Sequence, residues 1–191
     1  MALEKEEMIS VEDYLAGELV SEIKHEYLGG VVHAMAGGKV RHAAVSGNLF
    51  GSFFNSLRGK NCRPFSSDMK VRVDLPTQTR FYYPDLQVVC ESTGDDDSFQ
   101  DKPVVVVEVL RDSTKRIDLG EKRDAYLAVP SLKVLMIVDP GRLWVQLDRR
   151  GANGGFSQEL YHLAEEVIPL PEIETELRVA EIYEGIDLGV E

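Results

Sequence analysis

The run Pro103-Val104-Val105-Val106-Val107-Glu108-Val109-Leu110 is the feature that most constrains the fold of this chain. Four consecutive valines after a proline are typical of a central β-strand that is buried on both faces. An unpaired carboxylate in such a strand is costly, so Glu108 needs a partner. If the strand has already left the core at its C-terminal end, the partner is water or an arginine. Alternatively, Glu108 binds a metal ion or takes part in acid–base chemistry. The strand alone leaves both alternatives open.

A second carboxylate opens the strand that we expect over residues 83–90. Asp85 follows Pro84 there, and a polar loop over residues 91–102 leads from this strand to the valine run. If the two strands are antiparallel neighbours, the start of one lies beside the end of the other. Asp85 and Glu108 would then point at one spot, as a divalent metal requires. The three aspartates at 95–97 lack the spacing of a calcium loop, which favours a solvated turn.

Length and composition are those of an ordinary globular protein. The 191 residues are enough for one core, so we expect a single domain over residues 1–191. With 43% hydrophobic and 28% charged residues, no apolar run of transmembrane length and an acidic start, the sequence predicts a cytoplasmic protein with no membrane partner. Cys62 and Cys90 have no metal-type spacing, so we expect two free thiols in a reducing compartment.

The charge is unevenly distributed. The net charge of −12 argues against indiscriminate binding of nucleic acid. Residues 39–72 nevertheless hold seven bases and one acid, a net charge of +6, whereas residues 151–191 hold ten acids and one base, a net charge of −9. The basic segment could present one face to a phosphate backbone, or the acidic tail could pack near it and cancel it. The sequence leaves both alternatives open.

Local patterns predict the remaining elements. A capping box at residues 10–13 predicts a helix over 11–16, and two glycines at 29–30 predict a hairpin within 23–35. An apolar stripe predicts a helix over 40–57, in whose first turn His42 is expected to be a structural hydrogen-bonding group. A helix over 116–128 would place Asp118, Lys122 and Tyr126 on one face. Further strands are expected within 62–74, 132–138, 143–147, 156–163 and 166–170, and a helical turn at 179–183. The predicted fold class is α/β (α+β), a central mixed β-sheet flanked by helices, with an N-terminal helix and β-hairpin.

Several of these motifs, taken in order, resemble the PD-(D/E)XK restriction-endonuclease-like superfamily, and more closely the Uma-two family of predicted bacterial endonucleases. They are Pro84-Asp85, Glu108-Val109-Leu110, Asp118-x3-Lys122-x3-Tyr126, the strand from Leu135 to Pro140, and, upstream, His25-Glu26-Tyr27-Leu28-Gly29-Gly30 and Arg41-His42-Ala43-Ala44. The resemblance covers nearly the whole chain. It implies a restriction-endonuclease-like core with a central mixed sheet, a divalent metal and hydrolysis of a phosphodiester.

The resemblance also implies roles for individual residues. Asp85 and Glu108 match the two metal-binding carboxylates, and Glu26 matches an N-terminal glutamate that adds to the site. The strand position of Glu26 alone predicts an exposed, charged side chain. The implied metal is Mg²⁺ or Mn²⁺, because Mg²⁺ takes oxygen ligands and keeps several waters.

The lysine of the superfamily motif is the main departure. Residues two apart on a strand share a face, and the position two after Glu108 is Leu110, which cannot act as a cation. The Uma-two resemblance places the lysine in the following helix, where Lys122 is the matching residue. A second departure is the loop Arg111-Asp112-Ser113-Thr114, where relatives more often read Ser-Pro-Ser-Thr.

We therefore expect an Mg²⁺-dependent endonuclease, with Asp85, Glu108 and Lys122 as catalytic residues and nucleic acid, DNA first, as the partner. Homodimerisation is expected only by analogy with related nucleases. A non-catalytic binding module that keeps the nuclease fold is the alternative, and it predicts that Asp85 and Glu108 pair with Arg111 or Lys122. A metal-dependent hydrolase with another substrate is the third hypothesis.

Overall fold

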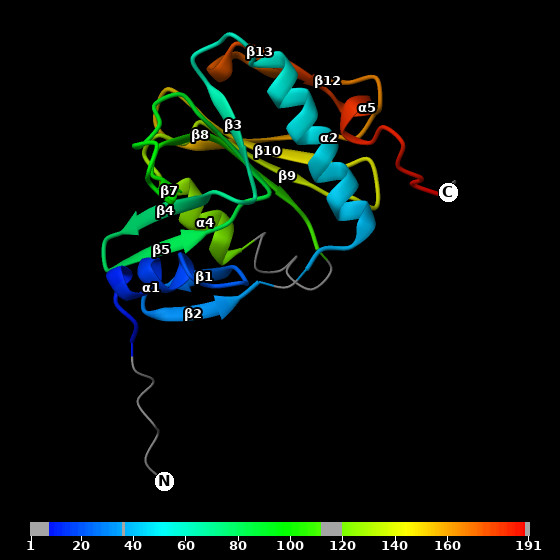
Figure 1. Cartoon of the computed structure of the whole chain (residues 1–191). Coiled ribbons are helices and arrows are strands. Elements are labelled where there is room, and N and C mark those ends of the chain that lie inside the picture. The colour runs from blue at the N-terminus through cyan, green and yellow to red at the C-terminus, as the bar shows by residue number, and fades with distance from the viewer. Residues whose placement is uncertain (1–7, 36, 112–119, 190–191) are drawn as a thin grey trace.

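The computed structural model describes residues 8–35, 37–111 and 120–189. The helices are α1 (Val11–Glu18), α2 (Val40–Ser56), α4 (Glu121–Leu127) and α5 (Val179–Ile182), with a 3-10 turn at Pro171–Ile173. The strands are β1 (His25–Leu28), β2 (Val31–Ala34), β3 (Arg63–Ser66), β4 (Lys70–Leu75), β5 (Gln78–Tyr82), β6 (Leu86–Val89), β7 (Phe99–Gln100), β8 (Pro103–Val109), β9 (Val134–Val138), β10 (Val145–Arg150), β11 (Phe156–Tyr161), β12 (Val167–Leu170) and β13 (Thr175–Arg178). Figure 1 shows α2 lying over the strands at the centre of the molecule, next to α5.

The central sheet is mixed, as predicted. Its strand order is β11-β10-β9-β8-β6-β3, and the valine run forms β8 in its interior. β8 is parallel to β9 and antiparallel to β6. A parallel neighbour on one side and helices on both faces explain why β8 reads as a continuous apolar run rather than an alternating one.

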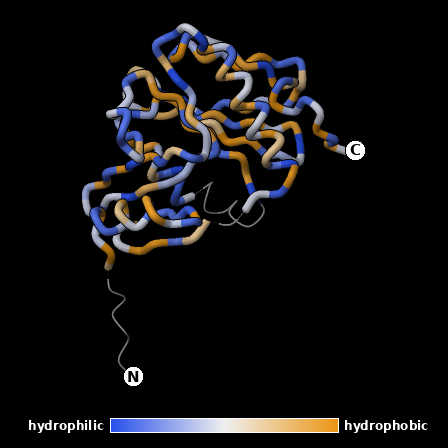
Figure 2. The backbone as a smooth tube through the Cα atoms, viewed as in Figure 1, coloured by the Kyte–Doolittle hydropathy of each residue, from blue (hydrophilic) through white to orange (hydrophobic). Residues whose placement is uncertain are grey.

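Alternation along β8 divides the core into two layers. Val105, Val107 and Val109 pack with the buried face of α2, which carries Val45, Leu49 and Phe53, and with Leu57 at the C-cap of the helix. Val106 and Leu110 face the other way, against α4 and the neighbouring strands β4 and β9. Glu108 shares the parity of Val106 and Leu110, so its side chain is directed toward α4. Figure 2 shows the apolar residues concentrated along these central strands.

A second sheet, of order β2-β1-β5-β4-β7, lies beside the first. The predicted hairpin forms β1 and β2, and its turn glycines Gly29 and Gly30 have φ of 59° and 107°, values that L side chains rarely adopt. The predicted N-terminal helix is α1, whose N-cap Ser10 Oγ accepts a hydrogen bond from Asp13 N at 3.0 Å. The sequence did not predict β5, which joins the hairpin to β4.

Two arginines fix α4 against the central sheet. Arg123 on α4 donates two hydrogen bonds, of 2.8 and 2.6 Å, to the buried carboxylate of Asp148 on β10. Arg150, at the end of β10, donates to the carbonyls of Leu127 and Val129 at the C-terminal end of α4, at 3.1 and 2.8 Å. A cation at these carbonyls also complements the helix dipole. The position of α4 over β8 is therefore held at both ends.

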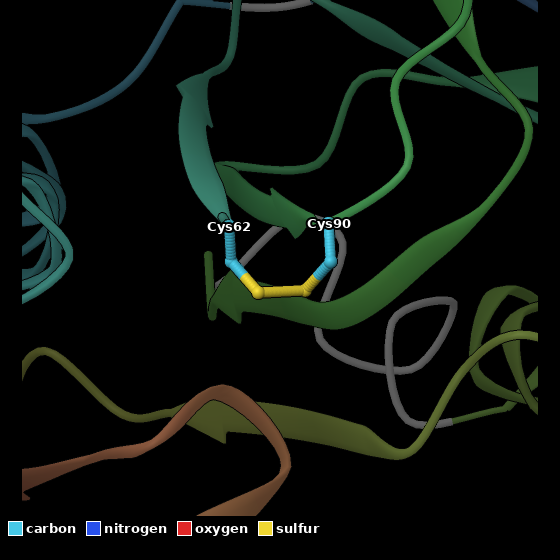
Figure 3. Close-up of a disulfide and its surroundings, with 2 residues drawn as sticks. All are labelled: Cys62 and Cys90. Carbon is cyan, nitrogen blue, oxygen red and sulfur yellow. A yellow bond between two sulfur atoms is a disulfide. The ribbon is translucent and has the colours of Figure 1, made fainter. Parts of the chain in front are cut away.

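The prediction of two free thiols is wrong, because Cys62 and Cys90 form a disulfide (Figure 3). Cys62 precedes β3 and Cys90 follows β6, and these strands are antiparallel with Arg63 paired to Val89. The next pair outward is Cys62 and Cys90. Their proximity depends on the pairing register of two strands that lie far apart in sequence, which cysteine spacing does not encode. The inference of a reducing compartment from free thiols has lost its basis.

The acidic C-terminal segment runs along α2, which supports the alternative that it packs near the basic segment. Asn48 Nδ2 donates to the carbonyls of Ile182 and Glu184, at 3.1 and 2.9 Å. Arg41, at the start of α2, donates to the carbonyl of Asp187 at 3.0 Å. Glu176, Glu181 and Glu184 border a groove along the polar side of the helix. This side of α2 is therefore acidic.

Candidate active site

Asp85 and Glu108 come from neighbouring strands, as the sequence predicted. β6 and β8 are antiparallel, and Leu86 pairs with Val107. The register, continued by one residue, places Asp85 opposite Glu108. Both residues are buried, with exposed fractions of 8% and 5%.

Glu108 is bound by two side chains from α4. Tyr126 donates its hydroxyl hydrogen to Glu108 Oε1 at 2.8 Å, and Lys122 Nζ lies 2.9 Å from the same oxygen. Lys122 and Tyr126 are four residues apart, so the predicted shared helix face is confirmed for these two. Burial raises the pKa of the Tyr126 hydroxyl well above its ordinary value, and the charge of Glu108 raises it further. Tyr126 therefore stays protonated as a hydrogen-bond donor.

Glu26 is joined to the same lysine. Its Oε1 lies 3.0 Å from Lys122 Nζ, and the amide of Tyr83 donates to it at 3.5 Å. Glu26 lies on β1 of the second sheet, so the ammonium connects carboxylates from two different sheets. The expectation of an exposed strand charge is wrong for Glu26, because its side chain is only 21% exposed and is paired.

Asp85 has a different set of partners. Val109 N donates to its Oδ2 at 2.8 Å, His42 Nε2 lies 3.2 Å from the same oxygen, and Arg111 Nη2 lies 3.4 Å from Oδ1. Burial alone would raise the pKa of Asp85. The hydrogen bonds from His42 and the Val109 amide, with the charges of His42 and Arg111, outweigh burial and hold the pKa below its ordinary value. Asp85 is therefore ionised at neutral pH.

His42 is the site residue that sequence reasoning undervalued. It is buried on α2, and Arg111 Nε approaches its Nε2 at 3.1 Å. Since Nε2 carries either a proton or a lone pair, it can donate to Asp85 or accept from Arg111, but not both at once. The expectation of a structural hydrogen-bonding group is consistent with these contacts. In the sequence, His42 stands in the motif Arg41-His42-Ala43-Ala44 of the Uma-two resemblance. That motif does not show that Asp85 is its partner.

Leu110, in the place of the superfamily lysine, is 3% exposed and packs with the apolar residues of α4. A cation reaches Glu108 from the helix instead, through Lys122. Asp118 and the loop residues Asp112, Ser113 and Thr114 lie outside the described part of the chain.

The residues present suit a small divalent cation in their chemistry. Carboxylate oxygens are hard ligands of the kind that Mg²⁺ and Mn²⁺ take, and Glu26 and Glu108 converge on one cationic point. Over residues 8–35, 37–111 and 120–189, however, no group of three or more acidic, histidine or cysteine side chains is assembled as a ready ligand set. The side chains that fit the cation are thus the two converging carboxylates of Glu26 and Glu108. Asp85 lies opposite Glu108 and is held by other partners.

The basic segment divides between two ends of α2. Lys39 and Arg41 are exposed at its N-terminal end, next to His42. Arg58, Lys60 and Arg63 follow its C-terminal end, roughly 25 Å away for a helix of this length. Lys70 is buried, and Arg72 pairs with Asp74 at 3.0 Å. Lys39 and Arg41 are therefore the exposed bases beside His42, the partner of Asp85. Arg63 lies on β3 and pairs with Val89, at the opposite end of β6 from Asp85.

A family model described as "Putative restriction endonuclease", named Uma2, matches residues 11–181. The chain belongs to the Uma2 family. A relative described as "Uncharacterized protein slr1290", from Synechocystis, is 32% identical over 179 residues, which are 93% of this chain and 93% of the relative.

The fold of this Uma2 chain is also similar to a solved structure. A crystal structure from Anabaena variabilis, described as "a putative nuclease belonging to DUF820", superposes with a TM-score of 0.71 and covers 91% of this chain and 97% of that one. At 15% identity, this similarity shows the fold alone. Among the described helices of the Uma2 chain, none is long and apolar enough to span a membrane.

Proposed function

We propose that this Uma2 chain is a metal-dependent endonuclease that hydrolyses phosphodiester bonds, with DNA as its substrate and Mg²⁺ or Mn²⁺ as its cofactor. The observation that carries the proposal is the buried cluster in which Lys122 Nζ lies within 3.0 Å of carboxylates from β1 and β8. Family membership supports the reaction class.

Each side chain has a role in this proposal. Asp85, Glu108 and Glu26 would hold the cation, which when bound supplies Lewis acidity and an activated water. Lys122 orients the attacking water and offsets the charge that develops on the phosphate. Tyr126 holds Glu108 in place through its hydroxyl, and Lys39 and Arg41 offer charge for the phosphate backbone.

Cleavage of supercoiled plasmid DNA with Mg²⁺ or Mn²⁺ tests the proposal. Asp85→Asn and Glu108→Gln should each lower the cleavage rate by roughly a hundredfold or more, since a metal supplies several kcal/mol of transition-state stabilisation. Glu12→Gln, at an exposed position on α1, is the matched control and should cleave normally. Full cleavage by Glu108→Gln would refute this assignment of the site. Light scattering of the same preparations would show whether the chain forms the homodimer expected by analogy.

A non-catalytic binding module is the second candidate, and one observation favours it. Asp85 pairs with Arg111 and Glu108 pairs with Lys122, the ion pairs that this hypothesis predicts. Such a protein would shift DNA in a gel without cleaving it, and neither Mg²⁺ nor Glu108→Gln would change its affinity. Calorimetry with Mg²⁺ separates the two candidates, because only the nuclease should show saturable binding that Glu108→Gln removes.

A further inference from the structure

Lys122 lies where three elements meet. It projects from α4 between Glu26 of β1 and Glu108 of β8, and its side chain is 8% exposed. The two carboxylate oxygens that it contacts lie at 3.0 and 2.9 Å from one nitrogen. The ammonium therefore bridges the two carboxylates.

The charges of these three groups do not balance. The formal charges of the two carboxylates and the ammonium sum to −1, whereas those of the two carboxylates and a divalent cation in its place sum to zero. A doubly charged cation is also attracted to two carboxylates more strongly than an ammonium is. The site therefore has a reason to prefer a doubly charged occupant.

We propose that the Lys122 ammonium and a divalent cation are alternative occupants of the space between Glu26 and Glu108, so that Lys122 substitutes for the cation until one binds. This inference rests on the proposed function, because it takes these carboxylates as ligands of the metal. It adds that binding and release of the cation move Lys122.

Simultaneous occupancy is disfavoured by size and charge. A Mg²⁺ ion holds oxygens at about 2.1 Å, so it would draw both carboxylates into the space that the ammonium now fills. A cation of charge +2 also repels the ammonium at such short range. In its present position the ammonium also lies over the ring of Tyr82, 5.4 Å from the ring centroid.

Lys70 provides a matched control within the same chain. It is as buried as Lys122, with exposed fractions of 4% and 6%, and it also lies over an aromatic ring, that of Tyr83. Its ammonium donates to the Tyr83 hydroxyl at 3.3 Å, and in the described part of the chain it forms no ion pair. A divalent cation therefore has no reason to replace Lys70.

Lys122→Met tests the proposal by thermal unfolding and calorimetry. Without metal, this variant should melt below the unmutated chain, because its two carboxylates lose their counter-charge. Mg²⁺ should restore its melting temperature where choline chloride of equal ionic strength does not. Its affinity for Mn²⁺ should rise by about tenfold or more, because the competing cation is gone. Lys70→Met should also melt lower, but Mg²⁺ should not restore it.

Amine labelling tests the proposal on the unmutated chain, so the result does not depend on whether a variant folds. Mass spectrometry after brief acetylation should show Lys122 labelled several-fold faster with Mg²⁺ present, while Lys70 stays unchanged. An equal rate for Lys122 with and without saturating Mg²⁺ would overturn the proposal. So would an affinity of Lys122→Met for Mn²⁺ equal to or weaker than that of the unmutated chain.

The failure of this inference and the failure of the proposed function are distinguishable. Suppose that the unmutated chain binds Mn²⁺ saturably, that Glu108→Gln abolishes this binding, and that Lys122→Met leaves it unchanged. The metal site would then stand, and only the exchange between the Lys122 ammonium and the metal ion would be wrong. If the unmutated chain and Lys122→Met both fail to bind Mn²⁺, the metal site itself is refuted, and the inference falls with it.

Discussion

His42 Nε2 lies 3.2 Å from Asp85 Oδ2, and both side chains are buried. This contact joins α2 to the start of β6 through two residues that are 43 positions apart in the sequence. Since Asp85 also accepts from the amide of Val109, it ties the helix, β6 and the end of β8 to one carboxylate. The contact is therefore expected to contribute to stability as well as to position Asp85.

A double-mutant cycle measures that contribution. His42→Ala and Asp85→Asn should each lower the free energy of unfolding, and the double variant should lose less than the sum, with a coupling of about 1–3 kcal/mol. Urea unfolding of the four proteins gives the value. His42→Ala combined with Asp148→Asn is the control, because Asp148 binds Arg123 instead, and these two changes should add. A coupling near zero for His42 and Asp85 would mean that their proximity contributes nothing.

Glu18 gives a pH dependence away from the candidate metal ligands. Its carboxylate lies 2.7 Å from His25 Nδ1 and accepts from the Tyr83 hydroxyl at 2.8 Å. Burial would raise the pKa of Glu18, but the hydrogen bonds from Tyr83 and His25 outweigh it and lower the pKa. A carboxyl group whose pKa is lower in the folded state stabilises the fold above its unfolded pKa, about 4.3. That stabilisation is lost as the pH falls through the folded pKa.

The variant Glu18→Gln should therefore lose about 1–3 kcal/mol of unfolding free energy at pH 7, because charged hydrogen bonds are replaced by neutral ones. The difference from the unmutated chain should shrink as the pH falls below about 4, where the carboxylate of the folded chain becomes protonated. Urea unfolding across this pH range checks both statements. Glu12→Gln, exposed on the same helix, should show no such trend. A difference that grows as the pH falls below about 4 would have the wrong sign.

The valine run predicted β8 and the Pro-Asp pair predicted the strand beside it, because both signals are local in sequence. β5 was not predicted, since its residues Gln78–Tyr82 mix polar and aromatic side chains that alternate only weakly. The disulfide was missed for a different reason: the pairing of Cys62 with Cys90 depends on the register of β3 against β6. Local patterns do not contain that information.

The same distinction applies to the candidate site. Asp85, Glu108 and Lys122 stand in motifs with recognisable spacing, so the sequence could propose them. The pairing of Glu26 with Lys122 depends on how the second sheet packs against α4, and the contact between His42 and Asp85 depends on how α2 lies on β8. These contacts follow from tertiary packing, and spacing along the chain does not determine them.

Reduction of the disulfide should destabilise the chain. A cross-link that closes a loop of 28 residues removes conformational entropy from the unfolded state worth about 3–4 kcal/mol in the chain-entropy model. Urea unfolding with and without dithiothreitol should show this difference. Cys62→Ser/Cys90→Ser should match the reduced protein and should not respond to the reductant. Equal stability of the oxidised and reduced chains would contradict the entropic account.

Tyr126→Phe isolates the hydrogen bond to Glu108. The ring stays in its place, 5.4 Å from that of Tyr82, but the donor at 2.8 Å from Glu108 Oε1 is lost. Because a buried charge loses a hydrogen bond, we expect a cost of about 1.5–3 kcal/mol in unfolding free energy. Tyr82→Phe is the matched control.

Tyr82 accepts from Arg80 at 3.0 Å, and Arg80 also pairs with Glu121 at 2.7 Å, so this control variant leaves the cation with a partner. Tyr82→Phe should therefore cost less than Tyr126→Phe. Urea unfolding of both variants gives the comparison. If Tyr126→Phe were as stable as the unmutated chain, Glu108 would be satisfied without the Tyr126 hydroxyl. The role of Tyr126 in holding that carboxylate would then be wrong, while the ion pair from α4 to β8 would stand.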